Sequence, residues 1–63
     1  MLIYGYRGNI EWSKVKAAIK RCTGMAAIDI ERLIKTIKSG NTVTMPDDFV
    51  LHDDLRALGI LVK

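Results

Sequence analysis

The sequence has 63 residues, of which 49% are hydrophobic and 27% are charged, and its formal net charge at neutral pH is +3. So short a chain makes one domain, residues 1–63, and its composition excludes the low-hydropathy, high-charge class of disordered proteins. No apolar run approaches the roughly 18 residues of a membrane span, no signal peptide is recognisable, and a single cysteine excludes an internal disulfide, so we expect a cytoplasmic protein that binds no membrane.

The first predicted element is a strand in the opening segment MLIYGYR. Aromatic and β-branched residues of this kind fit the pleated surface of a sheet. Simple alternation places Leu2, Tyr4 and Tyr6 on one face of the strand. The segment RGN then turns the chain toward a helix.

The first helix is predicted over residues 10–22. We expect Asn9 to cap its start and Glu11 to face the positive end of its dipole. Gly24 suits the left-handed residue that closes a helix. The residues of its buried stripe are spaced three and four apart: Val15, Ala18, Ile19 and Cys22.

The second helix is predicted over residues 26–38. Asp29 and Glu31 fall in its first turns, and Gly40 follows its end, where a positive φ is common. Its buried stripe again has helical spacing: Ile30, Leu33, Ile34 and Ile37.

The rest of the chain predicts a short strand, a third helix and a last strand. NTVTM is the strand, with Val43 and Met45 on one face. Pro46 and two aspartates then start a helix over residues 48–58, because proline suits the first turn and carboxylates suit the dipole. We expect some of its four large apolar side chains to form the buried face: Phe49, Leu51, Leu55 and Leu58.

The segment ILVK forms the last strand, so the order of elements is β-α-α-β-α-β. A helix or a sheet with one apolar face must bury that face against another layer. The sequence therefore predicts an α+β fold, a two-layer sandwich in which three helices cover three short strands.

Three motifs carry a family resemblance: VKAAIKRCTGM, then IERLI, and ILVK at the end. With the element order they resemble the C-terminal domain of the bacterial ribosomal stalk protein over roughly residues 12–63. In that family the first helix has the pattern Ile/Val-Lys-x-x-Arg and closes in x-Thr-Gly-Leu. The resemblance implies the fold class that also contains the Clp protease adaptor ClpS, and a helix pair that recruits translation factors through basic and apolar side chains.

The alignment on Thr23-Gly24 implies a changed contact face. Lys20 keeps the basic character of the family's arginine in the last turn, whereas Trp12 and Glu31 stand where that family has lysines. The resemblance therefore implies a module with the stalk fold and a rewritten contact face. Such a small chain suits a phage or mobile-element product that acts on a host machine.

Catalysis and metal binding find no support in the sequence. Asp48 and His52 lie four apart and share a helix face, but zinc sites use three or four protein ligands. Adjacent carboxylates on a helix point about 100° apart and cannot share a reacting atom. Two such pairs are present: Asp47 with Asp48, and Asp53 with Asp54. Cys22 is interpreted as a buried, inert thiol. We therefore expect no enzyme and no cofactor or metal site.

Positive charge is concentrated in residues 1–40, which carry eight basic and three acidic groups, a net charge of +5. The leading hypothesis is a non-catalytic module that docks an acidic partner protein with the basic face of its first two helices. The alternative is an ordinary solvated helix face, and Trp12 equally suits the core. The candidate partner-binding residues are cations and apolar anchors: Trp12, Lys16, Lys20, Arg21, Met25 and Lys35.

Two other functions remain open at this stage. A DNA- or RNA-binding regulator would use residues 19–40 as a helix-turn-helix and residues 41–63 as a wing-like remainder. Against it, Asp29 and Glu31 would meet phosphates near the start of the second helix. A homodimer formed through a sheet face or strand edge is the third hypothesis, because so short a chain has little core.

Overall fold

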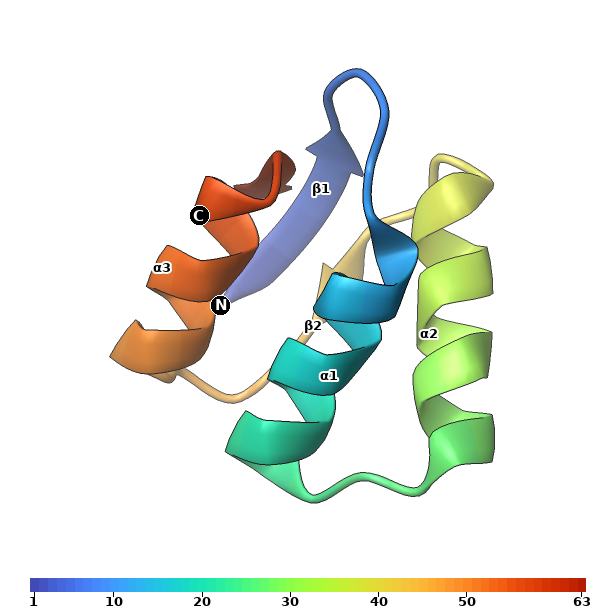
Figure 1. Cartoon of the computed structure of the whole chain (residues 1–63). Coiled ribbons are helices and arrows are strands. Elements are labelled where there is room, and N and C mark those ends of the chain that lie inside the picture. The colour runs from blue at the N-terminus through green and yellow to red at the C-terminus, as the bar shows by residue number, and fades with distance from the viewer.

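The computed structural model describes all 63 residues and contains six elements in the predicted order (Figure 1). In chain order they are β1 (Leu2–Tyr6), α1 (Trp12–Thr23), α2 (Ala27–Lys38), β2 (Val43–Thr44), α3 (Phe49–Ala57) and β3 (Ile60–Val62). The predicted α+β class and the order β-α-α-β-α-β are confirmed.

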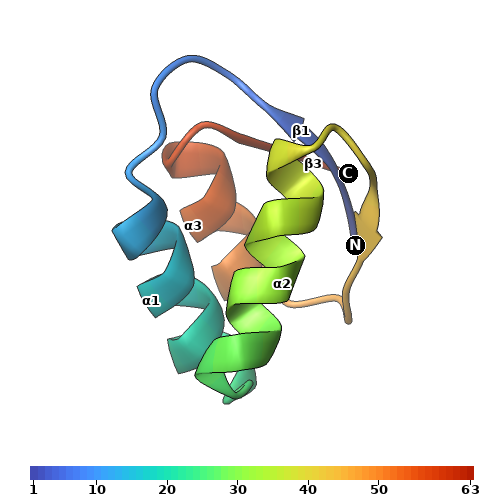
Figure 2. The same cartoon turned by 90° about the vertical axis from the view of Figure 1, so that its right-hand side faces the viewer.

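β1 is the central strand of a three-stranded sheet. The strand order is β2-β1-β3 and both pairs are antiparallel, with Ile3 opposite Val43 of β2 and opposite Val62 of β3. The three helices form a second layer on one side of the strands (Figure 2), and α1 lies between α2 and α3 in that layer (Figure 1). Most candidate partner-binding residues therefore belong to α1, which has α2 on one side and α3 on the other.

The core fills the space between the two layers. Cys22, predicted to be buried, is half-buried and packs against this core, as does Leu33. No polar or charged side chain is buried. Eleven hydrophobic side chains are buried, most of them from the predicted stripes: Ile3, Val15, Ala18, Ile19, Ile30, Ile34, Ile37, Met45, Leu51, Leu55 and Ile60.

A register shift in β1 changes the direction of its aromatic side chains. The pairing of β1 with β3 is irregular just before Gly5, as expected for a bulge at a strand glycine. Beyond it, the Tyr6 ring packs edge-on against Trp12 of α1, with the ring centroids 5.2 Å apart. The prediction that Tyr6 shares a face with Tyr4 is wrong, because one extra residue reverses the alternation.

α1 begins two residues later than predicted, at Trp12. Glu11 is the N-cap residue and makes no capping hydrogen bond with its side chain, so the predicted cap at Asn9 is wrong. Ile10 supplies the reason, because it packs against the core and its Cδ1 would lie 2.9 Å from a Cβ added to Gly59. This packing holds the preceding segment outside the helix.

The first turn of α3 is capped by an aspartate. Oδ1 of Asp48 accepts a hydrogen bond from the Leu51 N–H, with donor and acceptor 3.0 Å apart. The helix was predicted to start at Asp48 with Pro46 in its first turn, whereas Pro46 precedes the cap. β2 is also shorter than predicted, because Asn41 still bonds through its N–H to the Thr36 carbonyl at the end of α2.

Replacing Asp48 by alanine should lower the free energy of unfolding by about 1 kcal/mol, because one N–H of α3 loses its acceptor. Urea unfolding followed by circular dichroism measures this change. Asp48→Asn is the control, since asparagine also caps helices well. If asparagine proved as harmful as alanine, the capping bond would not be the cause.

Candidate functional site

α1 and α2 border an open groove on the helical side of the molecule. It is a hollow of about 290 Å³, and we call it the α1–α2 groove. Three of its side chains are apolar and three are charged, so it offers both contact area and charge. The lining residues are Lys16, Ala17 and Lys20 from α1 with Ala27, Ile30 and Glu31 from α2.

One row of α1 side chains faces this groove. Trp12, Lys16 and Lys20 are spaced four apart, so they lie above one another along the helix. Both lysines line the groove, and Trp12 meets α2 at Lys38, whose Nζ is 4.9 Å from the centroid of the indole ring. The row exists because the next row of α1, with Val15 and Ile19, is fully buried.

The facing row of α2 adds another of the predicted cations. Lys35 follows Glu31 by four residues, so it lies on the same side of α2 as the groove. Lys35 is exposed, as are Lys16 and Lys20. The fold therefore brings four of the six candidate residues, including Trp12, along one side of the α1–α2 pair.

The lysines of the groove have no acidic partner. Lys16 and Lys35 form no ion pair, and Nζ of Lys20 donates a hydrogen bond to the Met25 carbonyl, 3.0 Å away. Glu31 is likewise unpaired. The ion pairs of the protein lie elsewhere: the Met1 ammonium with Asp47, Lys14 with Glu11, Arg21 with Asp54, and His52 with Asp53. The groove thus keeps a net positive charge.

The two predicted apolar anchors lie at opposite ends of α1. Trp12 is half-buried: part of its side chain packs against the core and part is exposed on the surface. Met25 is also half-buried and lies in the connection between α1 and α2. A helix of 12 residues is about 18 Å long. Trp12 and Met25 therefore cannot line one pocket.

Arg21 lies outside the α1–α2 groove. Its guanidinium is 2.5 Å from Oδ2 of Asp54 on α3, and it lines a separate hollow between α1 and α3. Arg21 follows Lys20 by one residue, which turns it about 100° around the helix. Of the candidate cations, it is the one whose charge is offset within the protein.

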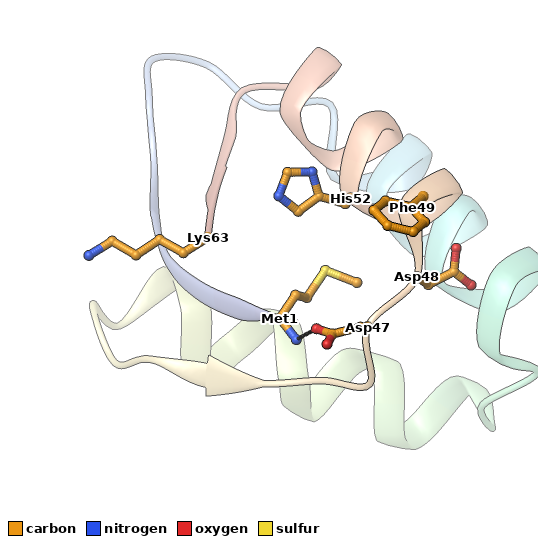
Figure 3. A pocket seen from close by; sticks show the side chains of 6 residues that line it. All are labelled: Met1, Asp47, Asp48, Phe49, His52 and Lys63. Carbon is orange, nitrogen blue, oxygen red and sulfur yellow. Dashed lines mark hydrogen bonds and ion pairs between the residues drawn. The ribbon is translucent and has the colours of Figure 1, made fainter.

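A further hollow, of about 300 Å³, lies beside the start of α3 (Figure 3). Phe49 stands at its rim and is 90% exposed, whereas Leu51 and Leu55, two of the four side chains from which the buried face was expected, are fully buried. Phe49 precedes Leu51 by two residues, which places it roughly 200° away around the helix. This spacing alone places Phe49 away from the buried face.

The charged groups of this hollow are engaged in local contacts. The Met1 ammonium, 2.5 Å from Oδ1 of Asp47, holds the pKa of that carboxyl below its usual value through a hydrogen bond and charge attraction, and His52 adds to the attraction. The Asp48 carboxylate accepts the capping hydrogen bond from the Leu51 N–H. The structure contains no cluster of three or more histidine, cysteine, aspartate or glutamate side chains that could hold a metal ion.

Comparison with known proteins adds no relative: no protein-family model, curated protein or solved structure matches this chain. No helix is long and apolar enough to cross a membrane, the two longest having 12 residues each. The functional argument therefore depends on the geometry and charge of the surface.

Proposed function

We propose that this protein is a small, non-catalytic binding module that docks an acidic protein surface in the α1–α2 groove. One observation carries the proposal: exposed apolar surface at Ala17 and Ala27, above the buried Ile30, lies between lysines that have no acidic partner in the chain. An isolated basic helix face would offer charge without such a hollow. A hollow without charge would not select its partner.

The two kinds of surface have separate tasks in binding. Lys16, Lys20 and Lys35 attract an acidic partner over a distance and raise the rate of association. The apolar surface, with the exposed part of Trp12 at one end, then provides contact area from which water is expelled. Charge sets the choice of partner, and apolar contact slows its release.

Glu31 favours a protein over a nucleic acid as the partner. Its carboxylate lines the groove without a neutralising partner, so a continuous row of phosphates along the groove would meet a negative charge. A folded protein surface can place a lysine, arginine or hydroxyl donor opposite Glu31 and acidic groups opposite the lysines. We therefore place the nucleic-acid hypothesis second.

The resemblance to the ribosomal stalk family supports the same choice of surface. In that family the helix pair recruits translation factors; α1 and α2 occupy the corresponding place in the order of elements, and Lys20 keeps the basic character of the family's arginine. We propose a stalk-like module with a rewritten contact face that modulates a host machine, as a phage-type regulator would. The sequence differences at Trp12 and Glu31 support a partner different from those of the stalk.

The test is affinity capture followed by measurement of Kd with the recovered partner. The triple variant Lys16→Glu, Lys20→Glu and Lys35→Glu should bind at least about tenfold more weakly, because charge attraction becomes repulsion at three points. Circular dichroism checks that the variant folds, which is expected because all three side chains are exposed.

Arg32→Glu is the matched control, since Arg32 is an exposed, unpaired cation of α2 that does not line the groove. It should leave Kd within about twofold of the parent value. An unchanged partner list and Kd for the triple variant would exclude this groove. A retardation assay that finds tight, steeply salt-dependent binding of DNA or RNA would favour the second hypothesis instead.

A further inference from the structure

The only phenylalanine of the chain stands outside its core. Phe49, the first residue of α3, is 90% exposed, and Val50 beside it is 61% exposed. Scattered apolar residues are common on protein surfaces, but a chain of 63 residues has little core to spare, and this one leaves its largest side chain without a polar atom in water. Two such side chains in succession indicate an interaction surface at the start of α3.

A recess lies directly beside this exposed ring. It is the hollow of about 300 Å³ bordered by Met1, His52 and Phe49 (Figure 3), and its lining is mostly apolar. The Lys63 side chain points away from it, with Nζ 5.1 Å from the centroid of the Tyr4 ring. Cavities of about 150 Å³ in other proteins hold benzene, so a phenyl group from another molecule has room here. Phe49 does not fill the space itself, because its side chain is almost fully exposed.

The charges around this hollow balance. The Met1 ammonium pairs with Asp47, and Asp48 and Lys63 add one charge of each sign, so the sum is zero while His52 is neutral. A second copy brings the same balanced set, and net charge therefore does not oppose its approach. The α1–α2 groove differs, because its net positive charge would repel the groove of a second copy. Of these two surfaces, the face at Phe49 is the one suited to self-association.

A protruding ring beside a recess is self-complementary under two-fold symmetry. In a two-fold dimer every contact occurs twice, so Phe49 of each copy can enter the hollow of the other. An aromatic side chain buries about 150–250 Å², and the recess that receives it loses a similar area, so two insertions bury on the order of 600–1,000 Å². Interfaces below about 1,200 Å² belong to the weak, transient class. The area therefore suits a dimer that forms only at high concentration.

We infer that Phe49 and the hollow beside it form a self-association site, through which two copies of the chain make a weak two-fold dimer. Burial of the two rings drives the association, and Val50 adds apolar contact beside them. This face differs from the sheet face or strand edge at which a homodimer was expected from the sequence. It is separate from the α1–α2 groove and does not depend on the function proposed for that groove.

The test is sedimentation equilibrium of the protein at concentrations from about 10 μM to about 1 mM. The apparent mass should rise across this range from the 7.1 kDa of one chain toward twice that value. Phe49→Ser should weaken the association at least about tenfold, because both inserted rings are lost. Circular dichroism checks that the variant folds, which is expected because the side chain is 90% exposed.

Ile28→Ser is the matched control. Ile28 is also a large apolar side chain near the start of a helix and is 58% exposed, but it does not line the hollow, so this variant should associate like the parent. The groove variant at Lys16, Lys20 and Lys35 should also associate, which separates this inference from the function proposed for the groove. Raising the salt concentration from about 0.1 M to about 1 M should not weaken the dimer, because apolar contact is not screened.

A mixed sample of ¹³C-labelled and unlabelled protein tests the position of the ring. Isotope-filtered NMR should show NOEs between the Phe49 ring of one copy and the Met1 methyl group of the other. A mass that stays at 7.1 kDa up to about 1 mM would overturn the inference, as would undiminished association of Phe49→Ser. If the chain stayed monomeric and Phe49→Ser lost binding of a captured protein, this face would belong to that protein and the inference would be wrong.

Discussion

Replacing Ile19 by alanine should destabilise the protein by about 2–5 kcal/mol, the range measured for truncation of large buried aliphatic side chains. Ile19 is fully buried in the middle helix of its layer, where it packs into the core. Domains of this size rarely have more than about 3–5 kcal/mol of stability. A large fraction of the variant should therefore be unfolded at 25 °C, which circular dichroism and urea titration would measure.

Ile28→Ala is the matched control for this prediction. Ile28 is the same residue type, also on a helix, but 58% of its surface is exposed. Its truncation removes little buried apolar area, so the stability should change by less than about 1 kcal/mol. If Ile19→Ala and Ile28→Ala had equal effects, the core described above would be incorrectly placed.

Replacing Gly59 by alanine should cost about 2 kcal/mol or more, from two physical causes. Gly59 has φ +94°, which L-residues with a Cβ rarely adopt. A Cβ there would also lie 2.9 Å from Ile10 Cδ1 and 3.2 Å from the Arg7 carbonyl oxygen. The methyl group would push apart the two segments that meet beside the start of β3.

Gly40→Ala separates these two causes. Gly40 has a similar φ of +88°, but a Cβ added there has no neighbour within 4 Å. Its alanine variant should show only the backbone cost, about 1 kcal/mol. The difference between the two variants in urea unfolding then measures the clash at Gly59. Equal losses would mean that Ile10 and the chain near Arg7 move aside freely.

The helices were predictable from sequence because their apolar spacing is strong. The stripe of Val15, Ala18 and Ile19 fixed which side of α1 is buried, and hence which side carries Lys16 and Lys20. The row of exposed residues on α1 is thus a direct consequence of local sequence. The sequence did not indicate which helix that row faces, because this depends on how α2 and α3 are arranged around α1.

The errors arose where distant contacts decide local structure. Ile10 was placed in a helix by its neighbours in sequence, but its packing beside Gly59 holds it outside α1. The Tyr6 side chain follows a bulge whose only signal was Gly5. Arg21 was grouped with the free lysines because nothing in the sequence indicates that Asp54, 33 residues away, lies beside it.

The position of β1 has a consequence for the time course of synthesis. β1 is the first strand to be made, yet it is the centre of the sheet, and its partners begin at residue 43 and residue 60. It has no partner strand while the ribosome adds α1 and α2, and its second partner follows α3. Because both pairings of β1 are long-range, the sheet is complete only once β3 has been made, and β1 is an unpaired apolar strand until then on at least one edge.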